Sequence, residues 1–213
     1  MKVSLVSYSQ PPGPVEQTLQ DLVAYCARVS NPENQDNKET NEKLIGYLIR
    51  NKHWSPLEMV SVCLEIETTR DIARQILRHR SFSFQEFSQR YAIPSLDFEP
   101  REARLQDSKN RQNSLETDDN SLKYQWLLKQ TIISEAAEEA YNWAIEKGIA
   151  REQARVVLPE GMTPSRMYVN GTLRSWIHYI ELRSGNGTQK EHREVALECA
   201  KVIGSIFPPV KQT

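Results

Sequence analysis

The stretch RHRSFSFQEFSQRY, which begins at Arg78, gathers side chains that could bind an anion. Arg78, His79, Arg80 and Arg90 lie within thirteen residues, and Glu86 is the only acid among them. Guanidinium groups bind phosphate through paired hydrogen bonds. Hydroxyls, amides and aromatic rings alternate with these cations, and a nucleotide needs such a mixture for its phosphate, its sugar and its flat base. The stretch therefore predicts a nucleotide-binding site.

The residues just before this stretch predict a helix over residues 70–80. The helix would stack Arg70, Arg74 and Arg78 on one face at i,i+4 spacing, where like charges oppose helix formation. One interpretation is a solvated, salt-bridged face with no ligand. Because Ile72 and Ile76 make the rest of the helix apolar, we expect the arginines at the edge of the core, beside a ligand.

More arginines follow downstream in segments with helical spacing: Arg151, Arg155, Arg166, Arg174 and Arg183. Arg174 and His178 share a face at i,i+4. Arg174 and Arg183 fall on opposite faces of a straight helix, since each residue turns the chain by about 100°. They are therefore expected to contact different ligands, one ligand from different directions, or different subunits.

The elements that must position these residues are mostly helices. Strands are predicted over residues 2–8 and 59–66, and helices over residues 15–29, 39–52, 70–80, 124–147, 151–158, 163–185 and 189–207, with Thr163 as a cap and Gly171 as a bend. The expected class is α+β, with residues 1–213 forming a helix-rich single domain on a small, mostly antiparallel sheet. The polar residues 95–121 are predicted to be a mobile surface insertion, either a linker or a lid over the site.

Composition excludes several classes of protein. The 213 residues are 38% hydrophobic and 26% charged with a formal net charge of -1, which argues against disorder, a fibrous repeat and non-specific nucleic-acid binding. The three cysteines form no CxxC and the four histidines no HExxH, so neither a disulfide framework nor a metal site is expected. The N-terminus has no apolar signal core and no segment reaches membrane-spanning length, so we expect a cytoplasmic protein with no membrane partner.

Ordered sequence blocks carry a resemblance to a known family. Arg78-His79-Arg80, seven further residues and Ser88 form the RHRx7S signature, and HWSPLEM at 53–59, SQRY at 88–91, ARVVLP at 154–159 and LRSWIHYIELR at 173–183 accompany it. With these blocks the chain resembles the flavin-dependent thymidylate synthases from His53 to about Arg193. The resemblance implies methylation of dUMP to dTMP with methylenetetrahydrofolate as carbon donor, FAD as redox carrier and NADPH as reductant. It also implies a homotetramer whose sites are shared between subunits.

The resemblance further implies roles for individual residues. Arg183 would be catalytic, interacting with the uracil ring near N3 and O4. The implied dUMP-binding residues are Gln75, Arg78, Glu86, Ser88, Gln89, Arg90, Arg155 and Arg183. The implied FAD-binding residues are Ser55, Arg78, His79, Arg80, Glu86, Thr172 (or Asn170), Arg174 and His178. Two departures stand out: Gln89 replaces a glycine common in relatives, and SGNGTQ after Arg183 lacks a histidine found in some of them.

The sequence favours methylation without a protein nucleophile. Cys26 and Cys199 fall in helical apolar patterns and Cys63 in a strand pattern, none beside a cation that would activate a thiolate. Ser88 has no activating base nearby in sequence and is expected to be a hydrogen-bond donor to the nucleotide. His53 is a candidate for positioning flavin or folate, and His192 has no assigned role. Two alternatives stay open: a basic helical nucleic-acid-binding module, and a flavin-binding protein without synthase activity.

Overall fold

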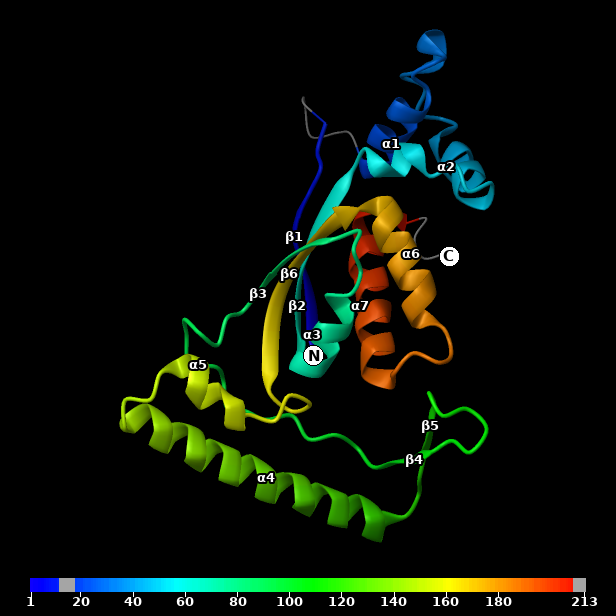
Figure 1. Cartoon of the computed structure of the whole chain (residues 1–213). Helices are drawn as coiled ribbons and strands as arrows, with labels where there is room; N and C mark the ends of the chain where they lie inside the picture. Colours follow the sequence, from blue (N-terminus) through cyan, green and yellow to red (C-terminus); the bar gives the residue numbers. More distant parts are fainter. Residues whose placement is uncertain (12–17, 209–213) are drawn as a thin grey trace.

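The computed structural model describes residues 1–11 and 18–208, and its centre is an antiparallel sheet of four strands (Figure 1). The strand order is β1 (Lys2–Tyr8), β2 (Ser61–Thr69), β6 (Pro164–Thr172) and β3 (Ser83–Glu86). Val62, Leu64 and Ile66 on one face of β2 are fully buried, whereas the residues between them are half-buried. This period of two supports the predicted strand, which begins two residues later than expected.

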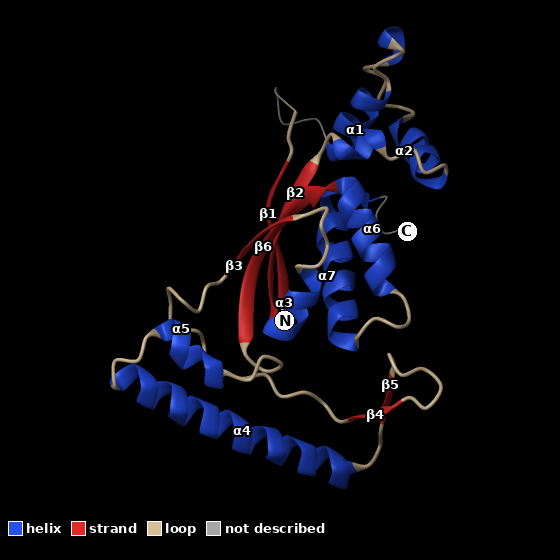
Figure 2. Cartoon of the chain, viewed as in Figure 1, coloured by secondary structure: helices blue, strands red, loops and turns tan. Residues whose placement is uncertain are grey.

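Helices α3 (Arg70–Ile76), α6 (Leu173–Ser184) and α7 (Lys190–Ile206) cover one face of the sheet (Figure 2). Their apolar sides and the buried face of β2 form one continuous core. Trp176 of α6 donates its indole Nε1–H to the Val62 carbonyl at 2.9 Å. The predicted α+β class with a small antiparallel sheet is therefore confirmed.

The other elements extend from the two ends of the sheet. At one end lie α1 (Leu19–Ala27), α2 (Asn41–Arg50) and the helical turn Ser55–Glu58; at the other lie α4 (Asn120–Glu146), α5 (Arg151–Ala154), the turn Arg155–Val157 and the hairpin of β4 (Arg104–Gln106) and β5 (Ser114–Glu116) (Figure 1). A further short turn spans Pro32–Asn34. The predicted helices over 39–52, 124–147 and 189–207 are confirmed with shifts of one to four residues at their ends. Residues 15–17 of the predicted first helix lie outside the described residues.

The prediction of one helical run over residues 163–185 was wrong for its first half, which forms β6. Met167, Val169 and Gly171 are buried while Arg166, Tyr168 and Asn170 are exposed, a period of two. Pairing with β2 on one side and β3 on the other satisfies the backbone of β6. Thr172, not Thr163, caps the helix, because its hydroxyl accepts the Ser175 N–H at 3.3 Å. The strand therefore passes directly into α6.

Gly171 is required by the close approach of Phe82 to the backbone of β6. A Cβ at Gly171 would lie 2.3 Å from Phe82 Cδ1. Phe82 has no free space to move into, because its ring packs against Trp176 at 4.5 Å and Tyr179 at 5.8 Å between centroids. The glycine predicted to bend a helix thus allows an aromatic ring to cover the sheet.

We expect Gly171→Ala to lower the free energy of unfolding by about 1–3 kcal/mol, the usual effect of overpacking a core. Urea unfolding would measure it. Gly161→Ala is the matched control, since nothing lies within 4 Å of a Cβ there and its backbone is not left-handed. Equal stability of the two variants would contradict the packing argument.

Several ion pairs join the polar residues 95–121 to the rest of the chain. Arg101 Nη2 lies 2.9 Å from Asp71 Oδ1 of α3, and Lys190 Nζ of α7 lies 2.8 Å from Glu102 Oε1 and 3.2 Å from Glu116 Oε1. These pairs hold the β4–β5 hairpin against the N-terminal end of α7. Movement of this segment over a site stays a prediction.

Candidate active site

Arg183, near the C-terminal end of α6, is oriented by His79, which follows α3. The Arg183 Nε–H donates to His79 Nε2 at 3.0 Å, so this ring nitrogen must carry a lone pair and the proton must be on Nδ1. Burial, together with the charges of Arg183 and Arg78, lowers the pKa of His79 to about 4. A neutral His79 thus fixes Arg183 through one nitrogen and leaves the other guanidinium nitrogens for a ligand.

Gln75 of α3 is linked to this pair through His192, whose ring lies 6.4 Å from that of His79 between centroids. Gln75 contacts His192 of α7 and Gln189, the residue before α7. Its Oε1 is 3.2 Å from His192 Nδ1, and its Nε2 donates to Gln189 Oε1 at 2.8 Å. His192 Nε2 is in turn 3.1 Å from the Tyr179 hydroxyl of α6. His192 is fully buried, and burial followed by the charge of Arg183 lowers its pKa to about 3. Three helices therefore bring Gln75, Arg183 and their supporting residues together.

The predicted stripe of three arginines is interrupted because α3 ends at Ile76 rather than at residue 80. Arg70 is buried, and its Nη1 lies 3.5 Å from Glu86 Oε1. Arg74 Nε donates to Glu160 Oε1 at 3.0 Å. Both arginines are therefore salt-bridged, but Arg70 is buried rather than solvated, which fits the expected place at the edge of the core. Arg78 and Arg80, in contrast, are exposed, and no acid of the described residues pairs with either.

Glu86 of β3 lies beside a hydroxyl donor and two arginines. Its Oε1 accepts from the Ser165 hydroxyl at 2.8 Å and lies within 3.5 Å of Arg70, while its Oε2 is 3.9 Å from Arg74 Nη1. A carboxylate has further lone pairs, so Glu86 can also accept hydrogen bonds from a ligand. β3 itself was missed in the sequence, since four residues carry too short a pattern.

A second group of predicted residues lies at the start of α6 and the turn Ser55–Glu58. Arg174 Nη1 donates to Glu58 Oε1 at 2.8 Å, and its Nε is buried without a partner among the described residues. The His178 ring contacts Trp54 edge-on at 4.7 Å between centroids. Ser55 is exposed, and Thr172 caps the helix. These are four of the eight residues that the family resemblance assigned to FAD.

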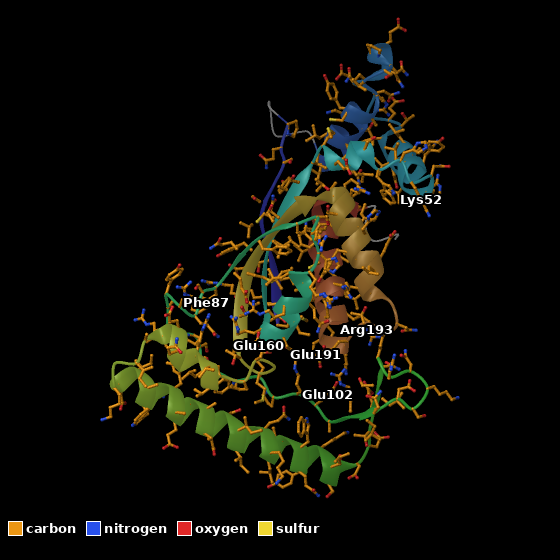
Figure 3. All side chains as sticks on the ribbon, in the orientation of Figure 1. Lys52, Phe87, Glu102, Glu160, Glu191 and Arg193 are labelled. Atoms are coloured by element: carbon orange, nitrogen blue, oxygen red, sulfur yellow. The ribbon has the colours of Figure 1, made fainter. Side chains whose placement is uncertain are left out.

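A third group comprises Ser88, Gln89, Arg90 and Arg155. Arg90 Nη2 lies 3.2 Å from Glu152 Oε2 of α5, and Gln89 is buried with its Nε2 unpartnered among the described residues. In Figure 3, Phe87, directly before this group, lies beside α5 and away from Glu191 on α7. No hydrogen bond or ion pair within residues 1–11 and 18–208 joins this group to Arg183. Within the described part of the chain, no direct contact of this kind links the third group to Arg183.

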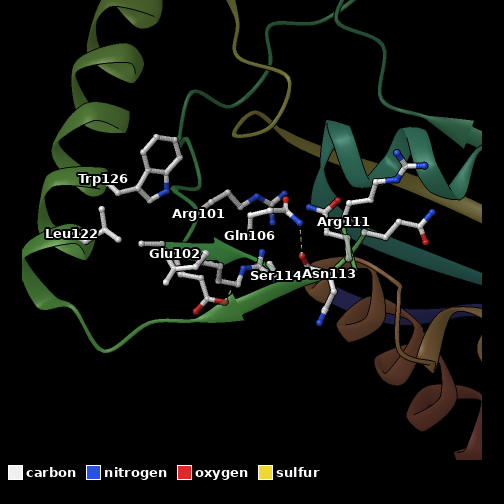
Figure 4. A pocket seen from close by; sticks show the side chains of 13 residues that line it. Arg101, Glu102, Gln106, Arg111, Asn113, Ser114, Leu122 and Trp126 are labelled. Carbon is white, nitrogen blue, oxygen red and sulfur yellow. Dashed lines mark hydrogen bonds and ion pairs between the residues drawn. The ribbon is translucent and has the colours of Figure 1, made fainter. Parts of the chain in front are cut away.

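Two hollows flank these groups. One of about 620 Å³ lies between the β4–β5 hairpin and the start of α4 (Figure 4). It is lined by Arg101, Arg104, Trp126 and Gln189 among others, and by none of the predicted site residues. Another of about 510 Å³ includes Arg90 of the third group. The first hollow nevertheless reaches the site indirectly, because Gln189 is hydrogen-bonded to Gln75.

Comparison with known proteins identifies the family. A family model described as thymidylate synthase complementing protein matches residues 14–209. The probable flavin-dependent thymidylate synthase of Paramecium bursaria Chlorella virus 1 is 49% identical over 99% of this chain and 97% of its own. The chain belongs to the flavin-dependent thymidylate synthase family. The member from Synechocystis sp. is 52% identical over 89% of this chain and 86% of its own.

A solved structure shares the fold of this chain. The UMP/dUMP methylase PolB from Streptomyces cacaoi, bound with 5-Br dUMP, has a TM-score of 0.83 and 28% identity over 99% of this chain and 93% of its own. The same protein bound with 5-Br UMP gives a TM-score of 0.81. The predicted family, the α+β fold and an enzyme of this type are thereby confirmed, and the family supports methylation of dUMP.

Sequence reasoning missed three residues around Gln75: Tyr179, Gln189 and His192. Tyr179 and His192 are almost completely buried. In the sequence they look like ordinary core positions of α6 and α7, and no local signal marks them. Gln75 and His192 are 117 residues apart in the sequence, so only the folded structure shows that they are in contact.

Proposed function

We propose that the protein converts dUMP to dTMP by reductive methylation, with methylenetetrahydrofolate as carbon donor, FAD as redox carrier and NADPH as reductant. Family membership over nearly the whole chain supports the reaction class. The observation that carries the proposal at the residue level is the Arg183–His79 pair, since it presents an oriented cation beside Gln75. Reduced FAD supplies the reducing equivalent when bound.

The residues present fit FAD. The exposed Arg78 and Arg80 offer cations for a pyrophosphate, and the buried, unpartnered Nε of Arg174 offers a donor that needs an acceptor. His178 adds a ring next to Trp54. Ser55, His79, Glu86 and Thr172 complete the proposed FAD-binding set.

The nucleotide would be bound by cations and amides from separate segments. Arg78, Arg90 and Arg155 would bind the phosphate together with the Ser88 hydroxyl and Gln89. Gln75 and Glu86 would bind other polar groups of dUMP. Arg183 would stabilise the negative charge that develops on the N3 and O4 side of uracil, which raises electron density at C5.

The thiols support a mechanism without a cysteine nucleophile. Cys199 is fully buried in α7, and burial raises its pKa far above the ordinary value. Burial also raises the pKa of Cys63 on β2. Because the thiolate is the reactive form, both thiols are poor nucleophiles at neutral pH. Ionic polarisation of the ring by Arg183 takes the place of covalent activation.

We propose a homotetramer with sites shared between subunits. The helix α4 exposes the apolar side chains Leu122, Tyr124, Trp126, Leu127, Leu128, Ile132, Ile133 and Trp143. An exposed apolar surface of this extent marks a protein interface. The third group has no direct bond to Arg183 within one chain. This fits the same arrangement, because a second copy could bring its own Arg90 and Arg155 to Arg183.

The net charge of -1 argues against a nucleic-acid partner. A cytoplasmic location stays a prediction. Within the described residues, no helix combines the length and apolarity that a membrane span requires.

Flavin absorbance and isotope release test the proposed function. Purified protein should carry or take up FAD, and should release tritium from C5-labelled dUMP only when NADPH and the folate donor are both present. FAD binding without dTMP formation would indicate a flavin-binding protein that lacks synthase activity. Steeply salt-dependent binding to oligonucleotides with no flavin uptake would instead favour the nucleic-acid-binding module.

We expect Ile132→Glu to dissociate the tetramer and to lower dTMP formation, because a charge in an apolar interface is not solvated and the sites need two copies. Ile132 is 61% exposed in the single chain, so the monomer should still fold. Light scattering after size-exclusion chromatography measures the mass. Asn51→Glu adds the same charge at an exposed position after α2, away from α4, and should retain the assembly. An unchanged mass for Ile132→Glu would exclude this face of α4 as the interface.

A further inference from the structure

Five side chains from three helices form a continuous hydrogen-bonded row through Gln75, which we call the Gln75 relay. The Tyr179 hydroxyl is 3.1 Å from His192 Nε2, and His192 Nδ1 is 3.2 Å from Gln75 Oε1. Gln75 Nε2 donates to Gln189 Oε1 at 2.8 Å, and Gln189 Nε2 donates to Glu191 Oε2 at 2.9 Å. The relay thus runs from a buried phenol to a carboxylate.

The carboxylate of Glu191 sets the direction of the relay. Its Oε1 is 3.5 Å from Arg101 Nη1 and also pairs with Arg104 Nη2. A carboxylate paired with two guanidinium groups offers only acceptor oxygens, so Glu191 accepts from Gln189. Gln189 must therefore turn its NH2 toward Glu191, and its carbonyl oxygen toward Gln75.

Each following member is determined by the one before it. Because Gln189 offers an acceptor, Gln75 must offer its Nε2–H to Gln189 and its carbonyl oxygen to His192. His192 must then carry its proton on Nδ1, and its bare Nε2 accepts from the Tyr179 hydroxyl. A flipped Gln75 carboxamide would oppose donor to donor at His192 and acceptor to acceptor at Gln189. The flipped orientation therefore loses the Gln189 hydrogen bond outright, and it keeps the His192 contact only if the ring moves its proton to Nε2.

The relay leaves half of the Gln75 carboxamide free. A carboxamide has two N–H donors and two acceptor lone pairs, and the relay uses one of each. Gln75 is half-buried, so the remaining N–H and lone pair are available to a ligand in a fixed order. An amide without the relay could exchange these two positions by rotating half a turn.

We propose that Gln189 and His192 are positioning residues, which together hold the Gln75 carboxamide in the one orientation that presents a fixed donor and a fixed acceptor to the nucleotide. The identity of the ligand rests on the proposed function, whereas the orientation rests only on the relay. The fixed orientation also gives specificity. A base or sugar edge with its donor and acceptor exchanged would place donor against donor and acceptor against acceptor on Gln75.

Nitrogen-15 NMR of histidine-labelled holoenzyme tests the orientation without measuring activity. We expect the His192 ring to be neutral at pH 7.5, with a protonated Nδ1 and a bare Nε2. His192→Asn removes one ring from the spectrum and so assigns its signals among the four histidines. A His192 ring protonated on Nε2 alone would overturn the relay, since Gln75 would then face it with its NH2.

Steady-state kinetics test the positioning role. His192→Leu fills the space without a hydrogen-bond donor. It should raise the KM for dUMP about tenfold, the loss expected when one hydrogen bond to the ligand is no longer held in position. kcat should change less. His192→Asn carries an N–H at the position of Nδ1 and should restore most of the affinity. Val195→Ala is the matched control, because it is buried in the same helix and outside the relay.

Two kinetic outcomes would overturn the proposal. One is an equal KM for dUMP in His192→Leu and His192→Asn. The other is a rise in KM in Val195→Ala as large as that in His192→Leu, which would indicate a merely structural effect. If the unaltered protein does not turn over dUMP, the proposed function fails together with this role in it, and the ring tautomer alone then reports whether the relay exists.

Discussion

Arg183→Ala should lower the rate of dTMP formation by about two to three decades, or about 3–4 kcal/mol of transition-state stabilisation, as expected on removing a charged donor aimed at a developing anion. His79 fixes this cation by accepting its Nε–H at 3.0 Å, so the remaining guanidinium nitrogens are already oriented before dUMP binds. An oriented donor stabilises the transition state without reorganisation. The loss should therefore fall mainly on kcat.

Tritium release and FAD content measured on the same preparation separate this effect from a loss of cofactor. Arg183→Lys retains the charge but not the planar fork that reaches both His79 and a ligand, so an intermediate rate is expected. Arg50→Ala is the control, because Arg50 is an exposed arginine at the end of α2. A kcat for Arg183→Ala equal to that of Arg50→Ala would remove Arg183 from the mechanism.

Lowering the pH from 7 to 5 should destabilise the fold by about 2 kcal/mol through His192 alone. The pKa of His192 is about 3 in the folded protein, against 6.5 ordinarily, so the unfolded chain binds the proton more readily. Stability contributed by neutral His192 is thus complete above pH 6.5 and is lost as the pH falls toward about 3. His79, with a pKa of about 4, adds a smaller loss because its side chain is half-exposed and screened.

Urea unfolding at a constant protein concentration measures this dependence. Asp21 and Glu102 do not interfere between pH 5 and 7, since their pKa values are lowered from 3.8 and 4.5. His192→Asn should be less stable than the unaltered protein at pH 7 but should lose less on acidification. His53→Asn, at an exposed position, should leave the slope unchanged. The same slope in both variants would show that His192 does not titrate as described.

The stretch proposed to bind the nucleotide stands out in the sequence because RHRx7S is a local pattern, and the apolar spacing of residues 189–207 was enough to predict α7. β6 could not be predicted in the same way. Thr163 and Pro164 imitate a capped helix start, whereas the strand is determined by its two neighbours, β2 and β3. The actual cap, Thr172, lies at the end of the strand.

The grouping of the site residues was even less accessible. Arg183 and His79 are 104 residues apart, and no periodicity reports that the guanidinium of one donates to the ring of the other. The same holds for Glu191, whose pairs with Arg101 and Arg104 connect a polar segment to Gln75 through Gln189. The residue types could be predicted from the family resemblance, but their partners depend on tertiary packing.

The direct passage from β6 into α6 fixes the rotational phase of the helix. β6 ends at Thr172 and α6 begins at Leu173, so no linker can absorb a change in length. One inserted residue at this junction would turn α6 by about 100° and shift it by about 1.5 Å. The side chains of Arg174 and Arg183 would then both point away from their present contacts. Natural length variation among relatives should therefore avoid this junction and collect instead in the β4–β5 hairpin.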